Sequence, residues 1–156
     1  MSSDLPDFTI DELEHLESLD FDTFTNDDAV TLGLLAVDVI RERDLNMAVD
    51  IVVGDDLVFR AKLKDTGPQN DEWLAGKAAV ARQFGEPSLL VKQRHLAAGT
   101  PFAERDDIDH SSMRAHGGSI PIRVRGAIVG TITASGEPDV VDHAVAAEAL
   151  RRFIDL

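Results

Sequence analysis

Alternating apolar and polar positions predict two β-hairpins in this chain. Residues 120–124 alternate with a period of two, which is typical of a strand with one buried face. Arg125-Gly126 supplies a turn, and the apolar or small residues 127–133 predict a return strand inside the sheet. Pro121 cannot donate a ladder hydrogen bond, so its strand is expected at a sheet edge, or Pro121 is expected to face away from its neighbour.

An earlier hairpin is predicted from residues 47–53 and 57–63, which flank a Gly-Asp-Asp turn. The second of these segments alternates strictly, which favours a strand with one buried face and one partly wet face. Asp50 interrupts the apolar run of the first segment. We expect its carboxylate to form a cross-strand ion pair with Arg60 or Lys62.

Apolar residues at helical spacing predict helices over residues 26–44, 70–84, 87–98 and 138–154. Gly85 directly follows the second of these helices, at the position where a glycine commonly ends a helix. The apolar line predicted to face the core from the first helix is Val30, Leu34, Val37 and Ile40, widened by Leu35 and Val39. That of the last helix is Val140, Ala144, Ala147 and Ile154.

The resulting order is helix, hairpin, two helices, hairpin, helix. Strands in antiparallel pairs, rather than strands alternating singly with helices, indicate an α+β fold in which helices pack against an antiparallel sheet. In this interpretation residues 25–156 form a single domain. Residues 1–24 form an acidic tail with a short helix, which a capping box from Thr9 to Glu12 begins.

Composition narrows the classes of partner and of chemistry. The chain has 156 residues, a net charge of −14 and no cysteine. An acidic surface repels nucleic acids and anionic membranes, and the lack of cysteine excludes disulfides, thiol catalysis and cysteine-type zinc or iron–sulfur sites. No stretch approaches the roughly 20 apolar residues of a membrane span. We therefore expect a cytoplasmic protein with no nucleic-acid or membrane partner.

A glycine-rich loop precedes the strand that starts near residue 120. It consists of His116, Gly117, Gly118 and Ser119. Two adjacent glycines let the backbone fold tightly and can bring amide N–H groups close to a ligand. The loop is therefore either a tight entry to the strand or part of a ligand-binding site.

Charged and aromatic residues on two helices are further candidates for a site. Trp73 and Lys77 lie four residues apart on an apolar helix line, so Lys77 either reaches water, forms an ion pair or serves a site. Together with His116 it could bind a propionate, phosphate or small carboxylate. Asp142 and His143 lie near the start of the last helix, and His143 points at the sheet or at a partner subunit.

Two longer segments carry a family resemblance. They are residues 115–153, AHGGSIPIRVRGAIVGTITASGEPDVVDHAVAAEALRRF, and residues 70–85, NDEWLAGKAAVARQFG. Both resemble the haem-degrading-domain family, which includes GlcG- and HbpS-like proteins, and within it a small uncharacterised cytoplasmic branch with a yeast member. Relatives often carry a basic residue immediately before the helix lysine, whereas Gly76 precedes Lys77 here.

The resemblance implies a profilin-like, GlcG-like fold, with an antiparallel sheet of about five strands flanked by helices. It also implies a homo-oligomer, a dimer or larger. Haem is the cofactor that the family name suggests, and without cysteine the natural iron ligand is histidine. The candidate metal ligands are His116 first, then His143 and His95.

Three functional hypotheses follow. The leading one is a non-enzymatic oligomeric binding module for haem or another small anionic ligand, with Trp73 and Lys77 contributing to the site. The second is an acid–base enzyme in which His116 is the base and Asp142 or Asp109 orients it. The third is a scaffold for protein interactions or a chaperone accessory factor, which predicts an exposed apolar groove.

Overall fold

The computed structural model describes residues 5–156. Its helices are α1 (Ile10–Glu14), α2 (Asn26–Glu42), α3 (Pro68–Phe84), α4 (Ser88–Ala97) and α5 (Asp139–Ile154), with short 3₁₀ helices η1 (His15–Ser18) and η2 (Phe102–Glu104). Its strands are β1 (Ala48–Val53), β2 (Asp56–Lys62), β3 (Ser119–Val124) and β4 (Ala127–Ser135). None of the helices in this part of the chain is long and apolar enough to span a membrane.

The strands form one antiparallel sheet in the order β2-β1-β4-β3. The α+β class is thereby confirmed, and the sheet has four strands where about five were expected. Both predicted hairpins are present, β4 is interior, and Pro121 lies on the edge strand β3 as its missing N–H requires. Asp50 pairs across the ladder with Arg60, whose Nη2 lies 2.8 Å from Asp50 Oδ2.

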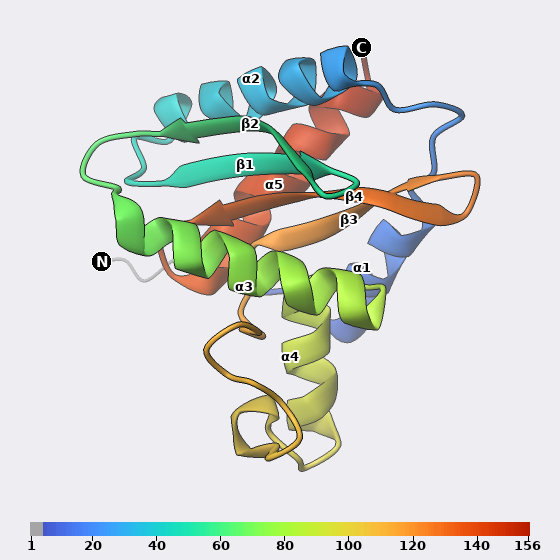
Figure 1. Ribbon diagram of the computed structural model, residues 1–156, viewed down its shortest axis with the longest axis vertical. Coiled ribbons are helices and arrows are strands. Elements are labelled where there is room, and N and C mark those ends of the chain that lie inside the picture. The colour runs from blue at the N-terminus through green and yellow to red at the C-terminus, as the bar shows by residue number, and fades with distance from the viewer. Residues whose placement is uncertain (1–4) are drawn as a thin grey trace.

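The two faces of the sheet differ in polarity. α2 and α5 cover the apolar face, where Ile51, Ile120 and Ile132 occupy one register row inside the main core. α3 crosses the opposite face, and Figure 1 shows it in front of the sheet while α5 runs behind. Thr133 and Ser135 of β4 point toward that face because successive strand residues alternate. The polar face brings hydrophilic side chains under α3.

The predicted core lines of α2 and α5 are partly wrong. Val37 and Ile40 are buried, but Val30 is 40% and Leu34 54% exposed. The buried face of α2 consists instead of Ala29, Leu32, Gly33, Ala36, Val37, Val39 and Ile40. In α5 the buried positions are Asp142, His143, Val145, Ala146, Ala149 and Leu150, whereas Ile154 is exposed. α2 and α5 pack against each other as well as against the sheet, so the buried side of each helix differs from the predicted one.

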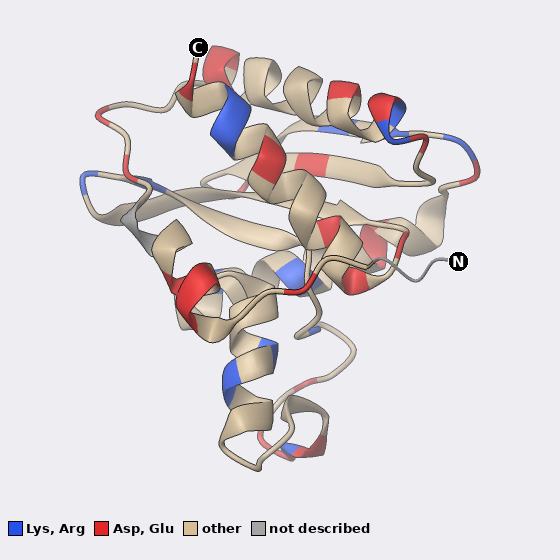
Figure 2. Cartoon of the chain, turned by 180° about the vertical axis from the view of Figure 1, so that it is seen from behind, with Lys and Arg blue, Asp and Glu red and all other residues tan. Residues whose placement is uncertain are grey.

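The N-terminal segment lies against the body of the protein. Leu13 of α1 is buried with Leu89 and Leu90 of α4. Phe21 lies beside the end of β3, where its N–H donates to the Arg123 carbonyl at 2.9 Å and its carbonyl accepts from another backbone N–H. Residues 1–4 of the expected acidic tail lie outside the described residues. Figure 2 shows the positions of acidic residues, in red, spread over the helices and loops of the reverse side.

Candidate functional site

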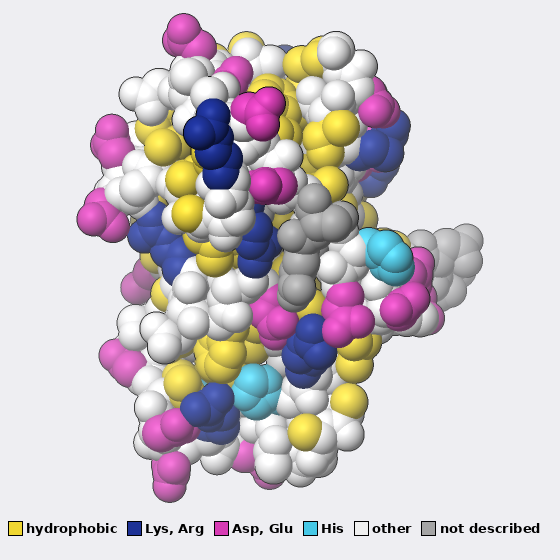
Figure 3. Space-filling view, turned by 90° about the vertical axis from the view of Figure 1, so that its right-hand side faces the viewer, with side chains coloured by type: hydrophobic (Ala, Val, Ile, Leu, Met, Phe, Trp, Pro, Cys, Tyr) yellow, Lys and Arg dark blue, Asp and Glu magenta, His cyan; other side chains and the backbone are white. Residues whose placement is uncertain are grey.

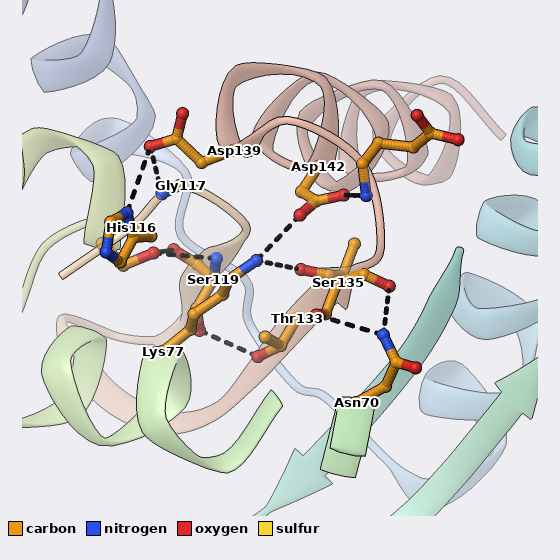
Figure 4. A network of polar contacts seen from close by, with 12 residues as sticks. Asn70, Lys77, His116, Gly117, Ser119, Thr133, Ser135, Asp139 and Asp142 are labelled. Atoms are coloured by element: carbon orange, nitrogen blue, oxygen red, sulfur yellow. Dashed lines mark hydrogen bonds and ion pairs between the residues drawn. The ribbon is translucent and has the colours of Figure 1, made fainter. Parts of the chain in front are cut away.

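Two adjoining cavities lie where the glycine loop enters β3. Trp73 and His116 line both of them. The first has a volume of about 590 Å³ and is mainly apolar, and the second has a volume of about 310 Å³ and is polar. Figure 4 shows His116 and Asp139 on one side of the loop and Lys77 with Asp142 on the other. The structure thus brings together four of the predicted site residues around the polar cavity, Trp73, Lys77, His116 and Asp142.

The apolar cavity lies beside α4 and the irregular segment that follows it. It is lined by Trp73, Lys92, Leu96, Pro101, Phe102, Ala103, His110, Met113, Arg114, Ala115 and His116. The Arg114 guanidinium lies 4.4 Å from the centre of the Trp73 ring, in cation–π geometry. A side chain at position 76 would come within 2.8 Å of Arg114, so Gly76 leaves the room that this arginine occupies.

The polar cavity contains a buried ion pair. Lys77 Nζ donates to Asp142 Oδ2 at 2.8 Å and to the Ala134 carbonyl at 3.0 Å. Asp142 Oδ1 accepts from the Glu137 N–H at 3.0 Å. Burial raises the pKa of Asp142 to about 6 and lowers the pKa of Lys77, while the pairing opposes both changes. Of the alternatives for Lys77, the structure shows an ion pair at the wall of a cavity.

His116 lies at the junction of the cavities, and its side chain is 48% exposed. Its Nδ1 is 3.9 Å from Asp139 Oδ2. That same oxygen accepts from Lys92 Nζ at 2.8 Å and from the Gly117 N–H at 3.1 Å. Desolvation first, and then the nearby Lys92 charge, lower the pKa of His116, so the neutral imidazole prevails at pH 7.

The expected carboxylate partners of His116 were wrong. Asp142 is engaged by Lys77, and Asp109 accepts from the Ser111 N–H at 3.0 Å within its own turn. The neighbouring carboxylate is Asp139. An oxygen that already accepts two hydrogen bonds and lies 3.9 Å away does not orient a ring as a catalytic partner does.

The glycine pair serves close packing of the chain. A Cβ atom on Gly117 would lie 2.4 Å from the Asp139 carbonyl oxygen, and one on Gly118 would lie 2.3 Å from the Ala134 carbonyl oxygen. The Gly117 N–H donates to Asp139, and the Ser119 N–H donates to Ser88 Oγ at 3.0 Å. These two amides are satisfied inside the protein, which favours the tight-entry alternative for the loop.

The candidate metal ligands do not form one centre. No three histidine or acidic side chains among residues 5–156 are grouped so as to hold a metal ion. His95 contacts the Val91 carbonyl through Nδ1 at 2.7 Å and Arg105 through Nε2 at 3.2 Å. His143 is buried against Phe8, with ring centres 4.7 Å apart, and desolvation lowers its pKa to about 4. His116 is the candidate of the three that lines the cavities.

Three charged residues of the site were not predicted from the sequence. They are Lys92, Arg114 and Asp139. Asp139 lies three residues before Asp142, and this helical spacing, which places both carboxylates on one helix face, was the signal that could have found it. Arg114 lies in an irregular segment, and no periodicity places the side chain of such a residue.

Comparison with known proteins decides the family. Residues 24–151 match the family of haem-degrading, HbpS-like proteins. The chain belongs to this family. A UPF0303 protein of Streptomyces coelicolor is 45% identical to it over 148 residues, which cover 94% of each chain. A UPF0303 protein of Burkholderia orbicola is 33% identical over 135 residues, which cover 86% of this chain and 82% of the relative.

Solved structures of the HbpS-like fold agree with this assignment. The Ybr137w protein superposes with a TM-score of 0.85 at 24% identity, covering 96% of this chain and 90% of that protein. HbpS gives a TM-score of 0.68 at 22% identity, covering 86% and 94% of the two chains. PduOC, whose structure is a haem complex, gives 0.69 at 18% identity, covering 83% and 94%. At these identities the likeness establishes a shared fold.

Proposed function

We propose that this chain is a cytoplasmic, homo-oligomeric binding module for a small ligand with an apolar body and an anionic group. Haem is the first such ligand to test. The single observation that carries this function is the pair of adjoining cavities with His116 in their shared wall. Cavities of about 300–1,000 Å³ with a few convergent polar groups are typical of small-molecule sites.

The chemistry of the cavity fits haem. Trp73, Phe102 and Met113 offer apolar and aromatic surface for a flat ring. Arg114 and Lys92 line the same cavity and can pair with propionate groups. His116 is held neutral by its lowered pKa, and a neutral imidazole nitrogen is the form that ligates iron. Bound haem would supply its iron centre, and these residues would bind and orient it.

Binding is favoured over acid–base catalysis by the surroundings of His116. The nearest carboxylate, Asp139, is paired with Lys92 and lies 3.9 Å from the ring. The face in Figure 3 gives less support to a role in protein interaction, because its hydrophobic side chains occur in small groups among acidic and basic ones. Exposed apolar residues do occur on α2, namely Val30 and Leu34, and we propose that they contribute to contacts between subunits.

A haemin titration followed in the Soret band tests the ligand. We expect a saturable shift at a fixed stoichiometry, and we expect His116→Ala to weaken binding by about tenfold or more because it removes the iron ligand. His15→Ala is the matched control, since this exposed histidine lies outside both cavities and should leave binding unchanged. Non-saturating spectra, or equal losses in both variants, would contradict haem binding.

An iron-free porphyrin separates the contribution of the anionic groups to binding from that of the iron. The affinity for the iron-free porphyrin should not change in His116→Ala, but it should fall in Arg114→Met, because Arg114 lines the apolar cavity. Arg125→Met, which removes an exposed arginine from the β3–β4 turn, is the control for lost positive charge. If the two arginine variants weaken porphyrin binding equally, the apolar cavity is not the binding site.

The mass of the protein in solution, measured by light scattering, tests the homo-oligomer.

A further inference from the structure

The amine of Lys77 is a buried nucleophile that ligand binding in the apolar cavity does not use. Its side chain is 3% exposed and that of Asp142 is 2% exposed. Yet both residues line the polar cavity of about 310 Å³, so a small molecule in that cavity can reach them. Figure 4 shows the Lys77 nitrogen between Asp142 and the end of β4. The group is held in place by contacts of 2.8 Å to Asp142 and 3.0 Å to the Ala134 carbonyl.

The environment lowers the cost of moving a proton from the Lys77 ammonium to the Asp142 carboxylate. Desolvation lowers the pKa of Lys77 and raises the pKa of Asp142 to about 6. Both changes bring the pKa values of the two groups closer together than they are in water, so the neutral pair of amine and carboxylic acid is easier to reach from the ion pair. A neutral lysine amine in a desolvated site is the usual nucleophile toward carbonyl compounds. The Asp142 carboxylate lies within hydrogen-bond distance and can take the proton.

We propose that Lys77 captures a small aldehyde or ketone in the polar cavity as an imine. A proton passes from Nζ to Asp142 Oδ2, and the freed electron pair of Nζ forms a bond to the carbonyl carbon. The nitrogen, which now carries a positive charge, releases one proton, and the carbonyl oxygen takes up that proton to give a neutral carbinolamine. The C–O bond then breaks, water leaves with a proton returned by Asp142, and the C=N bond forms. The sum is lysine ammonium plus carbonyl compound giving protonated imine plus water, with Asp142 a carboxylate at the start and at the end and with no oxidant or reductant.

The charges around the cavity define the class of carbonyl compound. Asp142 is paired with Lys77, and Asp139 is paired with Lys92. Among residues 5–156 no cation forms a salt bridge with the third lining carboxylate, Glu137, which accepts from the Asn46 N–H at 2.9 Å. His116 is neutral at pH 7 because its pKa is lowered. The cavity is therefore slightly negative and repels a keto acid anion. Carboxylate oxygens accept hydrogen bonds from hydroxyl groups, so the substrate class is a small, uncharged hydroxyaldehyde or hydroxyketone.

Reductive trapping tests this capture in the wild-type protein. The chain contains four lysines, Lys62, Lys64, Lys77 and Lys92, so each can be quantified by peptide mass mapping. The protein is incubated briefly with glycolaldehyde and cyanoborohydride, which converts an imine to a stable secondary amine. We expect initial labelling of Lys77 to exceed that of each other lysine by about tenfold or more, because only a desolvated amine beside a proton acceptor is activated. If the four lysines of the wild-type protein were labelled to the same extent, the proposed imine capture would be overturned.

Glyoxylate is the charge-matched comparison, since it has a similar size and carries a carboxylate. Slower labelling of Lys77 by glyoxylate than by glycolaldehyde is expected, and the reverse order would overturn the uncharged substrate class. Lys77→Arg keeps the positive charge but cannot form an imine, so it should remove the fast labelling and leave the other lysines unchanged. Imine capture is independent of haem binding, because the trapping experiment contains no haemin and the haemin titration does not involve Lys77.

Discussion

Lys77 and Asp142, 65 positions apart in the sequence, form an ion pair that joins α3 to the first turns of α5 over the end of β4. The bond is 2.8 Å long, and both side chains are buried. The same lysine donates to the backbone of β4 through the Ala134 carbonyl. One side chain thus connects a helix on the polar face of the sheet with a strand and with the helix that covers the other face.

Removing one partner of this pair should destabilise the fold strongly. Lys77→Met leaves the Asp142 carboxylate buried without its cation, which typically costs about 3–5 kcal/mol. Lys77→Met combined with Asp142→Leu removes both charges and should recover a large part of that loss. Urea unfolding at pH 7 measures the four free energies of unfolding, those of the wild type, Lys77→Met, Asp142→Leu and the double variant. If the loss of unfolding free energy in the double variant equals the sum of the losses in the two single variants, the residues do not act as a pair.

Asp142 also predicts a particular pH dependence. Its pKa is raised from 3.8 to about 6 in the fold, so the folded state binds a proton more readily than the unfolded state. The stability that this group contributes is fully present below pH 4 and is lost as the pH rises through 6. Asp142→Asn cannot titrate, so the difference in unfolding free energy between wild type and variant should change across this window. A constant difference from pH 4 to 7 would contradict the raised pKa.

Titration of the neighbouring His143 should make the stability of the fold depend on pH in the opposite direction. Burial lowers its pKa from 6.5 to about 4, so the unfolded state binds the proton more readily. Its contribution is fully present above pH 6.5 and is lost as the pH falls toward 4, by about 3 kcal/mol in total.

His143→Leu isolates this effect. The variant should be destabilised less than the wild type when the pH falls. It should keep its stability near pH 7, because Nδ1 of His143 has no hydrogen-bond partner among residues 5–156. Thermal unfolding measured at pH 7 and at pH 4.5 checks both statements. A large loss of stability at pH 7 would show that the imidazole makes an essential contact.

Much of the fold was readable from the sequence because its signals are local. The period-two alternation of residues 120–124 and the Arg125-Gly126 turn predicted the β3–β4 hairpin, and Pro121 indicated its edge position. The Asp50–Arg60 ion pair followed from strand register. Signals of this kind depend on a few neighbouring residues, and tertiary contacts did not override them.

The predictions that failed depend on contacts between distant segments. Val30 and Leu34 have helical spacing but are exposed, because α2 turns a different side, the one that carries Leu32, toward α5 and the sheet. The carboxylate near His116 proved to be Asp139, since the chain reversal at Gly117 brings the loop against the first turn of α5. Sequence spacing suggested Asp142 but could not reveal that Lys77 had already engaged it.

Gly117→Ala should be more costly than a glycine substitution in an open turn. The added Cβ would lie 2.4 Å from the Asp139 carbonyl oxygen, so the loop or the start of α5 must move, at a cost of about 3 kcal/mol. Gly54→Ala is the matched control, because Gly54 has a φ of +63° but no atom within 4 Å of the added Cβ. It should lose only the roughly 1–2 kcal/mol of left-handed backbone strain. Equal melting temperatures for the two variants would contradict the steric role of Gly117.

Trp73 is the only tryptophan of the chain, so its fluorescence reports on the site directly. Its ring centre lies 5.4 Å from that of His116 in an edge-to-face arrangement. A protonated imidazole at this distance quenches indole emission, so emission should rise as the pH increases and His116 loses its proton. The midpoint should lie below 6.5, because desolvation and Lys92 lower the pKa of His116.

Two variants assign this transition. His116→Gln should abolish it, and Asp139→Asn should move its midpoint to lower pH, because the Asp139 charge favours the protonated ring. Removal of Asp139 also frees Lys92, whose positive charge then acts on His116 without its partner and adds to the downward change. A midpoint that rises in Asp139→Asn would show that Asp139 does not stabilise the imidazolium. The emission change would then have to come from another group near Trp73.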